Sequence, residues 1–254
     1  MPTKSSALTD VGRRRSHNED SFFISDELEL FLVADGMGGH AAGEIASHTA
    51  VIAISDFVRR AMADRDMTWP FGVDDTLSEV ENIVLSAIKL ANQRICQMAA
   101  EKSSLTGMGT TIAGVKIDDG KATVFHVGDS RVYRLRDGKI MQLTADHSWV
   151  NEQLQRRMIT EEEARNHRWR HVITRALGNK ASIDVDLKTV QVQDGDLLLI
   201  CTDGLSGLVS DESIVKTLVD HDGDLGEACK ALIGQANQAG GHDNVTVVIV
   251  QYTD

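Results

Sequence analysis

The chain has 254 residues, of which 42% are hydrophobic, and it carries a formal net charge of -12 at pH 7. This acidic balance argues against nucleic-acid binding, because phosphate backbones are held by clustered Lys and Arg. No run approaches the roughly 18 apolar residues that span a bilayer. The N-terminus also lacks the apolar core of a signal peptide, so we expect no membrane insertion.

Composition favours one domain over residues 1–254. The chain has two prolines, Pro2 and Pro70, and only residues 66–75 resemble an irregular loop. Its three cysteines are scattered along the sequence, at Cys96, Cys201 and Cys229. Such unpaired cysteines fit a reducing compartment. We therefore expect a single cytoplasmic domain, and we expect it to be a monomer.

The first predicted elements form a hairpin. Residues 21–25 and 29–34 have the composition of two short strands around a polar turn. Folding this hairpin places Asp20 opposite Asp35 at its open end. Two amphipathic helices are predicted next, from apolar residues at helical spacing, over residues 41–65 and 77–100.

The middle of the chain reads as an antiparallel meander. Aspartate-glycine turns at residues 118–121 and 136–139 are typical of hairpins. Asp129 lies in the tight link between two of the predicted strands, residues 122–127 and 131–135.

A polar helical insert is predicted from about residue 146 to residue 167. The elements after it are strands over residues 183–192 and 197–201, helices over 211–220 and 225–238, and a strand over 245–250. Asp203 follows one of these strands and Asp243 precedes another, so the two share an end if the strands are antiparallel neighbours. Strands in blocks, paired helices and aspartate-glycine hairpins indicate an α+β fold with antiparallel sheets.

Five aspartates thus stand at strand ends beside a glycine or an asparagine: Asp20, Asp35, Asp129, Asp203 and Asp243. One such aspartate is usually a turn residue, but five with the same surroundings favour a common site. Carboxylates this close raise one another's pKa unless a cation lies between them. Oxygen ligands without clustered Cys and His favour magnesium, manganese or calcium over zinc.

Two other patterns have simpler explanations. Residues 36–41 match the glycine fingerprint of dinucleotide-binding folds, but that fold needs a second strand ending at Asp56, which lies inside a helical pattern. The glycines fit better with close backbone approach to the metal cluster, with the carbonyl of Gly36 available as a ligand. Cys201 lies in an apolar run and is typical of a buried thiol rather than a nucleophile.

Six motifs in chain order resemble the signatures of the PPM family of metal-dependent serine/threonine protein phosphatases, the type 2C phosphatases. They are RSHNED at residues 15–20, DGMGGH at 35–40, GTT at 109–111, GDSR at 128–131, TDGL at 202–205 and GHDNVT at 241–246. Together they span nearly the whole chain, and its compact length resembles bacterial members.

The resemblance implies a four-layer αββα sandwich of two antiparallel β-sheets flanked by helix pairs. It also implies a binuclear magnesium or manganese centre, with Asp35 bridging the two ions and Gly36 offering its carbonyl. Asp20, Asp203 and Asp243 would complete the centre. Bacterial members often bind a third ion, which Asp129 would hold together with Asp203. Residues 146–179 correspond to the family's variable flap.

Two further residues are candidates for catalysis. The guanidinium fork of Arg15 matches two phosphate oxygens, and its motif position agrees with the family's phosphate-binding arginine. His40 is a candidate to protonate the leaving oxygen, because histidine titrates near neutral pH. The alternative for His40 is a helix N-cap or a hydrogen-bonded histidine. His242 would orient a ligand, and Asn244 would fix the local turn.

We therefore expect hydrolysis of phosphoserine and phosphothreonine in proteins by direct attack of a hydroxide that bridges two metals. The expected partners are phosphorylated proteins, including a bacterial serine/threonine kinase that the enzyme opposes. Two alternatives stay open: a pseudophosphatase that only binds phosphoproteins, and a phosphomonoesterase of small metabolites. The intact carboxylates and Arg15 favour an enzyme over a regulator.

Overall fold

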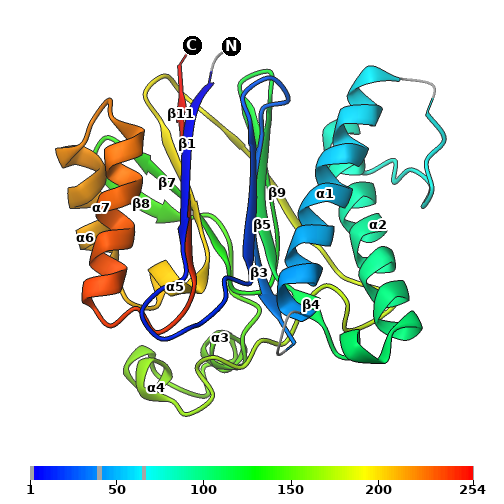
Figure 1. Ribbon diagram of the computed structural model, residues 1–254. Helices are drawn as coiled ribbons and strands as arrows, with labels where there is room; N and C mark the ends of the chain where they lie inside the picture. Colours follow the sequence, from blue (N-terminus) through cyan, green and yellow to red (C-terminus); the bar gives the residue numbers. More distant parts are fainter. Residues whose placement is uncertain (1–2, 39–41, 65–66, 254) are drawn as a thin grey trace.

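Two antiparallel sheets lie face to face, and a pair of helices covers the outer face of each (Figure 1). This arrangement is seen in a computed structural model that describes residues 3–38, 42–64 and 67–253. The α+β sandwich expected from the sequence is confirmed.

The first sheet has the strand order β2-β3-β5-β6-β9, and β4 pairs with β3. Its strands are β2 (Asp20–Ser25), β3 (Leu30–Met37), β4 (Gly109–Thr110), β5 (Ile112–Asp118), β6 (Lys121–Val127) and β9 (Asp186–Gln191). The second sheet has the order β1-β11-β10-β7-β8. Its strands are β1 (Thr3–Asp10), β7 (Arg131–Arg136), β8 (Lys139–Gln142), β10 (Leu197–Cys201) and β11 (Val245–Tyr252).

The long helices agree closely with their apolar periodicity. They are α1 (Ala42–Ala63), α2 (Glu79–Glu101), α6 (Asp211–Asp220) and α7 (Leu225–Gln238). Helix α2 begins at a capping box, in which the Ser78 hydroxyl accepts from the Glu81 N–H and the Glu81 carboxylate accepts from the Ser78 N–H. The short helices are η1 (Ser103–Leu105), α3 (Trp149–Gln155), α4 (Glu161–Asn166) and α5 (Asp203–Ser206).

Three apolar clusters hold the four layers together. One lies between the first sheet and α1–α2, with Phe57 and Ile88 among its members. A second packs α6 and α7 on the other sheet, for example through Leu232. The third fills the space between the sheets, where Phe31 and Ile200 are fully buried. Apolar contact on both faces explains why β10 is a continuous apolar run and why most residues of β3 and β5 are buried.

The predicted single meander is wrong, because its strands belong to two sheets. Both aspartate-glycine hairpins form, and their turn residues have positive φ, as at Asp119 (45°) and Gly120 (69°). Between the hairpins, however, β6 lies in the first sheet and β7 in the second. Gly128, at φ 112°, makes the crossing just before Asp129. The crossing brings Asp129 to the end of the sandwich.

Strand β1 was not predicted from the sequence. Its residues are mostly polar and half-buried, so they give no clear period-two signal. Pairing with β11, from Thr3 opposite Tyr252 to Asp10 opposite Val245, fixes the strand instead. The predicted helical insert is present as the two short helices α3 and α4, at the end of the sandwich opposite the chain termini (Figure 1). Within the described ranges, no helix is long and apolar enough to cross a membrane.

The layered core predicts a contrast between two isoleucines on the paired helices. Ile88 on α2 is fully buried, whereas Ile52 on α1 is 41% exposed. We expect Ile88→Ala to lower the free energy of unfolding by about 2–5 kcal/mol, because it leaves a cavity. The matched control Ile52→Ala should cost less than about 1 kcal/mol. Urea denaturation measures both values, and equal losses would contradict this packing.

Candidate metal centre

The β2–β3 hairpin brings two of the candidate aspartates together. Asp20 lies directly opposite Asp35 in the strand register, as the hairpin prediction required. One carboxylate oxygen of Asp20, Oδ2, accepts hydrogen bonds from Thr202 Oγ1 at 2.9 Å and Thr246 Oγ1 at 2.7 Å. These threonines belong to the other sheet, so Asp20 joins the two sheets at this end.

The second sheet supplies Asp203 and Asp243. Strands β10 and β11 are antiparallel neighbours with Cys201 opposite Val247, so the residues after β10 and before β11 share an end. Asp203 is the first residue of the short helix α5, and Gly204 packs against the Asn244 carbonyl so closely that no Cβ would fit. This contact fixes the backbone of the two segments side by side.

The fifth aspartate, Asp129, lies at the crossing between the sheets and is 7% exposed. Asp20, Asp35, Asp129, Asp203 and Asp243 are called the acidic cluster below. Asp35 is paired with Asp20 across the hairpin, and the charges of the other four aspartates all raise its pKa. The structure therefore brings together all five aspartates singled out from the sequence.

Burial and mutual repulsion make the acidic cluster unfavourable as bare charges. Burial raises the pKa of Asp20 and of Asp129 to about 7. Burial, followed by repulsion from the other four carboxylates, raises the pKa of Asp35 well above its usual range. The pKa of Asp203 is raised by burial and by Asp243, although Asp35, His171 and Arg15 partly offset the shift.

Three members of the acidic cluster also have an unsatisfied oxygen. Oδ1 of Asp20, Asp129 and Asp203 is buried and has no hydrogen-bond partner among the residues that the structure describes. A buried acceptor without a donor is costly. A hard divalent cation would satisfy these oxygens and cancel the repulsion at the same time. The donor set therefore fits magnesium or manganese.

Arg15 is positioned beside the acidic cluster. Its Nη2 donates to Asp243 Oδ2 at 2.8 Å, and half of its side chain is exposed. This hydrogen bond raises the pKa of Arg15, and the charges of Glu19 and Asp35 act in the same direction. Arg15 thus has both an anchor at the cluster and free surface for an anion.

Glu19 belongs to this site but was not singled out from the sequence. Burial raises its pKa, and Arg15 counteracts the shift. Its Oε1 is buried without a hydrogen-bond partner in the described part of the chain. Only its place between Asn18 and Asp20, in a motif already noted, could have indicated a role.

Asn244 connects the Arg15 loop to the acidic cluster. Its amide nitrogen donates to the carbonyls of Val11 and His17, both at 2.9 Å, and its Oδ1 accepts from the Glu19 N–H at 2.8 Å. Its own N–H donates to Asp243 Oδ1 at 2.9 Å. The sequence predicted a local turn residue, but Asn244 also fixes a loop more than 220 residues away in the chain.

The remaining candidates divide into three cases. Gly36 is tightly enclosed, since an added Cβ would lie 2.1 Å from the Gly43 carbonyl oxygen. His40 lies outside the described residues. His242 is exposed, and the structure gives it no hydrogen bond to Asp243 among the described contacts.

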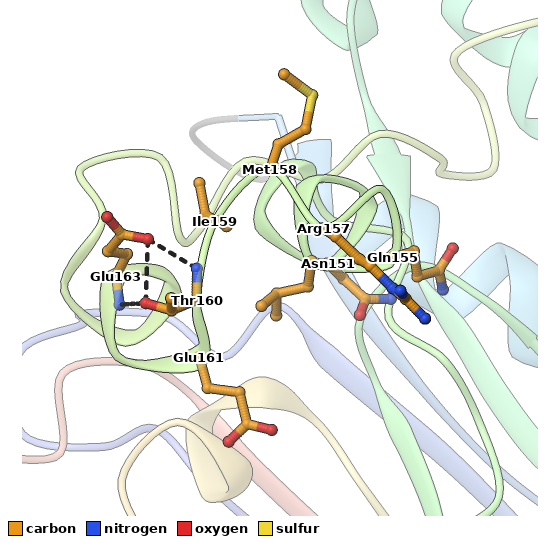
Figure 2. Close-up of a pocket in the computed structure, with 9 residues that line it drawn as sticks. Asn151, Gln155, Arg157, Met158, Ile159, Thr160, Glu161 and Glu163 are labelled. Carbon is orange, nitrogen blue, oxygen red and sulfur yellow. Dashed lines mark hydrogen bonds between the residues drawn. The ribbon is translucent and has the colours of Figure 1, made fainter.

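A separate hollow lies on the flap, residues 146–179, between α3 and α4 (Figure 2). Its lining includes Asn151, Arg157, Met158 and Thr160, and the figure shows the capping hydrogen bonds between Thr160 and Glu163. None of its lining residues belongs to the acidic cluster. The hollow is therefore not the metal centre.

Comparison with known sequences identifies close relatives. The profile described as Protein phosphatase 2C matches residues 11–233. Protein phosphatase PhpP of Streptococcus pneumoniae is 37% identical over 254 residues, covering 98% of this chain and 97% of the relative. Serine/threonine phosphatase stp of Listeria monocytogenes is 37% identical over 246 residues, covering 96% and 93% respectively.

Solved structures share the same fold. The Mycobacterium tuberculosis serine/threonine phosphatase PstP/Ppp superposes with a TM-score of 0.86 at 34% identity, covering 99% of both chains. The catalytic domain of PstP in complex with two manganese ions gives a TM-score of 0.83 at 35% identity, again covering 99% of both chains. That neighbour holds the kind of metal that the donor set here fits.

The repulsion in the acidic cluster predicts that Asp129→Asn changes the stability of the protein in opposite directions with and without metal. In a chelator, we expect Asp129→Asn to be at least as stable as the wild type, because it removes a buried charge that Asp203 and Asp146 repel. With manganese the order should reverse, since a ligand at 100 times its Kd stabilises by about 2.7 kcal/mol. Thermal unfolding under both conditions tests this.

The exposed Asp184→Asn is the matched control for this comparison and should change neither midpoint. If Asp129→Asn destabilises the metal-free protein and leaves the manganese effect unchanged, Asp129 has a structural role instead.

Proposed function

Because this chain belongs to the protein phosphatase 2C family, it is a metal-dependent serine/threonine protein phosphatase, and we propose that the acidic cluster is its active site. One observation carries the proposal: five aspartates meet at the end of the sandwich, and three of them have buried oxygens without a hydrogen-bond partner among the described residues. Bound cations would satisfy these oxygens and offset the repulsion among the carboxylates.

We infer that Asp35 and the Gly36 carbonyl would hold two Mn²⁺ or Mg²⁺ ions. Asp20, Asp203 and Asp243 would complete the set, and Asp129 together with Asp203 would hold a third ion. Bound ions supply an activated water and neutralise the phosphate charge. Because Thr202 and Thr246 already bond Asp20 Oδ2, the free Oδ1 is the oxygen that we assign to an ion.

Arg15 is proposed to bind the phosphate of the substrate. Its half-exposed guanidinium lies at the edge of the acidic cluster, where Asp243 anchors one nitrogen and leaves other donors available. Two parallel hydrogen bonds to phosphate oxygens would orient the group for attack. Glu19 and Asn244 hold the loop that carries Arg15, so their proposed role is to position it.

The leaving serine or threonine oxygen needs a proton. We propose His40 as its donor on chemical grounds, since an imidazole can carry a proton near neutral pH. No covalent phosphoenzyme is proposed. The thiol of Cys201 is fully buried, and burial raises its pKa to about 12, which supports its exclusion as a nucleophile.

We propose one catalytic domain over residues 1–254, with the flap as an insert, acting as a monomer. We further propose that it works in the cytoplasm, which its three free cysteines support. The proposed partners are phosphoproteins, including a serine/threonine kinase whose action it reverses.

The function predicts manganese-dependent hydrolysis of a phosphothreonine peptide. We expect Asp35→Asn to lose most of this activity, because a neutral amide is a weaker ligand for a hard cation than the carboxylate that we assign to the ions. The exposed Asp184→Asn should retain wild-type rates. Phosphate release from the peptide and from a sugar phosphate, measured side by side, tests both points. A preference for the sugar phosphate, or full activity of Asp35→Asn, would contradict the proposal.

Replacing Arg15 by lysine keeps the charge but removes the fork. We expect Arg15→Lys to raise KM for the phosphopeptide and to lower kcat/KM about 10- to 100-fold, as the loss of charge-assisted hydrogen bonds of about 1.5–3 kcal/mol implies. The neighbouring exposed Arg14→Lys is the control and should leave both constants within twofold, which is about 0.4 kcal/mol. Equal effects of the two variants would show that this loop only steers anions.

A further inference from the structure

His147, the second residue of the flap, is bonded to the backbone just before Asp129. Its N–H donates to the Gly128 carbonyl at 2.9 Å, and its Nδ1 accepts from the Gly128 N–H at 3.1 Å. The side chain is 6% exposed. One residue therefore holds both polar groups of Gly128.

Gly128 fixes the backbone that leads directly into Asp129. It has φ of 112°, and an added Cβ would lie 2.6 Å from Thr111 Cγ2, so the crossing cannot relax toward Thr111. On that side, Thr111 Oγ1 shares a hydrogen bond of 2.7 Å with Ser130 Oγ. Asp129 thus lies between Gly128, which His147 holds, and Ser130, which Thr111 holds.

The Nε2 atom and the carbonyl of His147 face the returning segment of the flap and Asp186. Its Nε2 lies 3.3 Å from Asp186 Oδ2, and Asp186 Oδ1 accepts from Arg175 Nη1 at 2.7 Å. The His147 carbonyl also accepts from the Thr174 N–H at 2.8 Å. Thr174 and Arg175 form the returning segment of the flap. A continuous chain of contacts therefore runs from Arg175 through Asp186 and His147 to Gly128.

The same contacts argue against a metal ion at His147. Ligand atoms of His126, His147 and Asp186 lie within 4.8 Å of one another, which is close enough for an ion. However, His147 Nδ1 accepts a hydrogen bond, so the neutral ring carries its proton on Nε2. Burial, His126 and Arg175 lower the pKa of His147 to about 4, which keeps the ring neutral. Metal on Nε2 would require an imidazolate, whereas the protonated Nε2 only lies near Asp186 Oδ2, at 3.3 Å, without a hydrogen bond to any described residue.

His126 supports this arrangement from below the ring. It stacks on His147 with ring centroids 4.5 Å apart, and its own Nε2 donates a hydrogen bond to the Ala145 carbonyl at 2.8 Å. The orientation of the His147 ring is therefore fixed by packing as well as by hydrogen bonds.

We propose that His147 is a positioning residue that couples the flap to Asp129. The conformation of the flap segment with Thr174 and Arg175 and the affinity of the protein for the third metal ion would then depend on each other. This inference rests on the proposed function, in which Asp129 is a metal ligand. His147 is not a catalytic residue, because its contacts are with Gly128, Asp186 and Thr174 rather than with the acidic cluster. Loss of these contacts should act on the metal that Asp129 holds.

Two substitutions separate the two sides of the ring. The Oδ1 of His147→Asn stands near the position of Nδ1 and keeps an acceptor for Gly128. In His147→Gln, the amide nitrogen stands near the position of the ring Nε2 and keeps an N–H group close to Asp186. We expect His147→Gln to weaken the weakest of three manganese sites about tenfold or more, as loss of an outer hydrogen-bond partner commonly does. His147→Asn should weaken that site less.

Isothermal titration calorimetry with manganese measures these affinities without any substrate. A double-mutant cycle with Asp186→Asn tests the coupling, because the second change should add little once His147 is replaced by Gln.

Hydrogen exchange of residues 146–179 should quicken in His147→Asn and Asp186→Asn, where the flap contact is lost. Asp129→Asn, which should lose the third site, sets the maximum effect, and the exposed His48→Gln is the control.

Wild-type number and affinity of manganese sites in a folded His147→Gln would overturn the proposal. So would additive effects in the cycle, or a wild type that binds only two ions. Circular dichroism verifies folding, and Asp186→Asn, at an exposed position, tests the chain of contacts if the His147 variants do not fold. Failure of the proposed function is a separate result, because it would appear as absent phosphopeptide hydrolysis while the calorimetry stayed interpretable.

Discussion

The repulsion among five carboxylates at one end of the sandwich is the constraint on which the rest of the structure depends. Two like charges about 4 Å apart at an effective dielectric of 20 repel by about 4 kcal/mol. Several such pairs are comparable with the whole stability of an ordinary domain, about 5–15 kcal/mol. The metal-free protein relieves this strain by taking up protons, since burial, reinforced by the neighbouring carboxylates, raises the pKa of Asp20 and of Asp129 to about 7. Bound cations relieve it and create a reactive site at the same time.

The acidic cluster is held in place by contacts between the two sheets. Strand pairing sets Asp20 opposite Asp35, and Thr202 and Thr246 from the other sheet bond the same Asp20 oxygen. Asn244 fastens the loop of Arg15 to β11. Each contact joins segments far apart in the chain, so the geometry of the site exists only in the complete fold. Apolar packing on both faces of each sheet supplies the rigidity that this geometry needs.

Much of this architecture could be predicted from sequence where the signal is local. The aspartate-glycine hairpins, the helices over residues 211–220 and 225–238, and the pairing of Asp20 with Asp35 all follow from turn chemistry and periodicity. Strand β1 and the change of sheet at Gly128 could not be predicted, because both depend on partners distant in sequence. The same reason explains why Glu19 and His147 were not singled out: their importance lies in contacts with Arg15 and Gly128, which a linear reading does not reveal.

The most direct test of the central claim is anomalous diffraction from crystals of the protein grown with manganese. Two strong manganese peaks beside Asp35, each also within ligand distance of Asp20, Asp203 or Asp243, are the result that the account predicts. A weaker third peak is expected beside Asp129. Manganese at His126, His147 and Asp186 instead, or no peak at the acidic cluster, would contradict the claim that these carboxylates gather to hold cations.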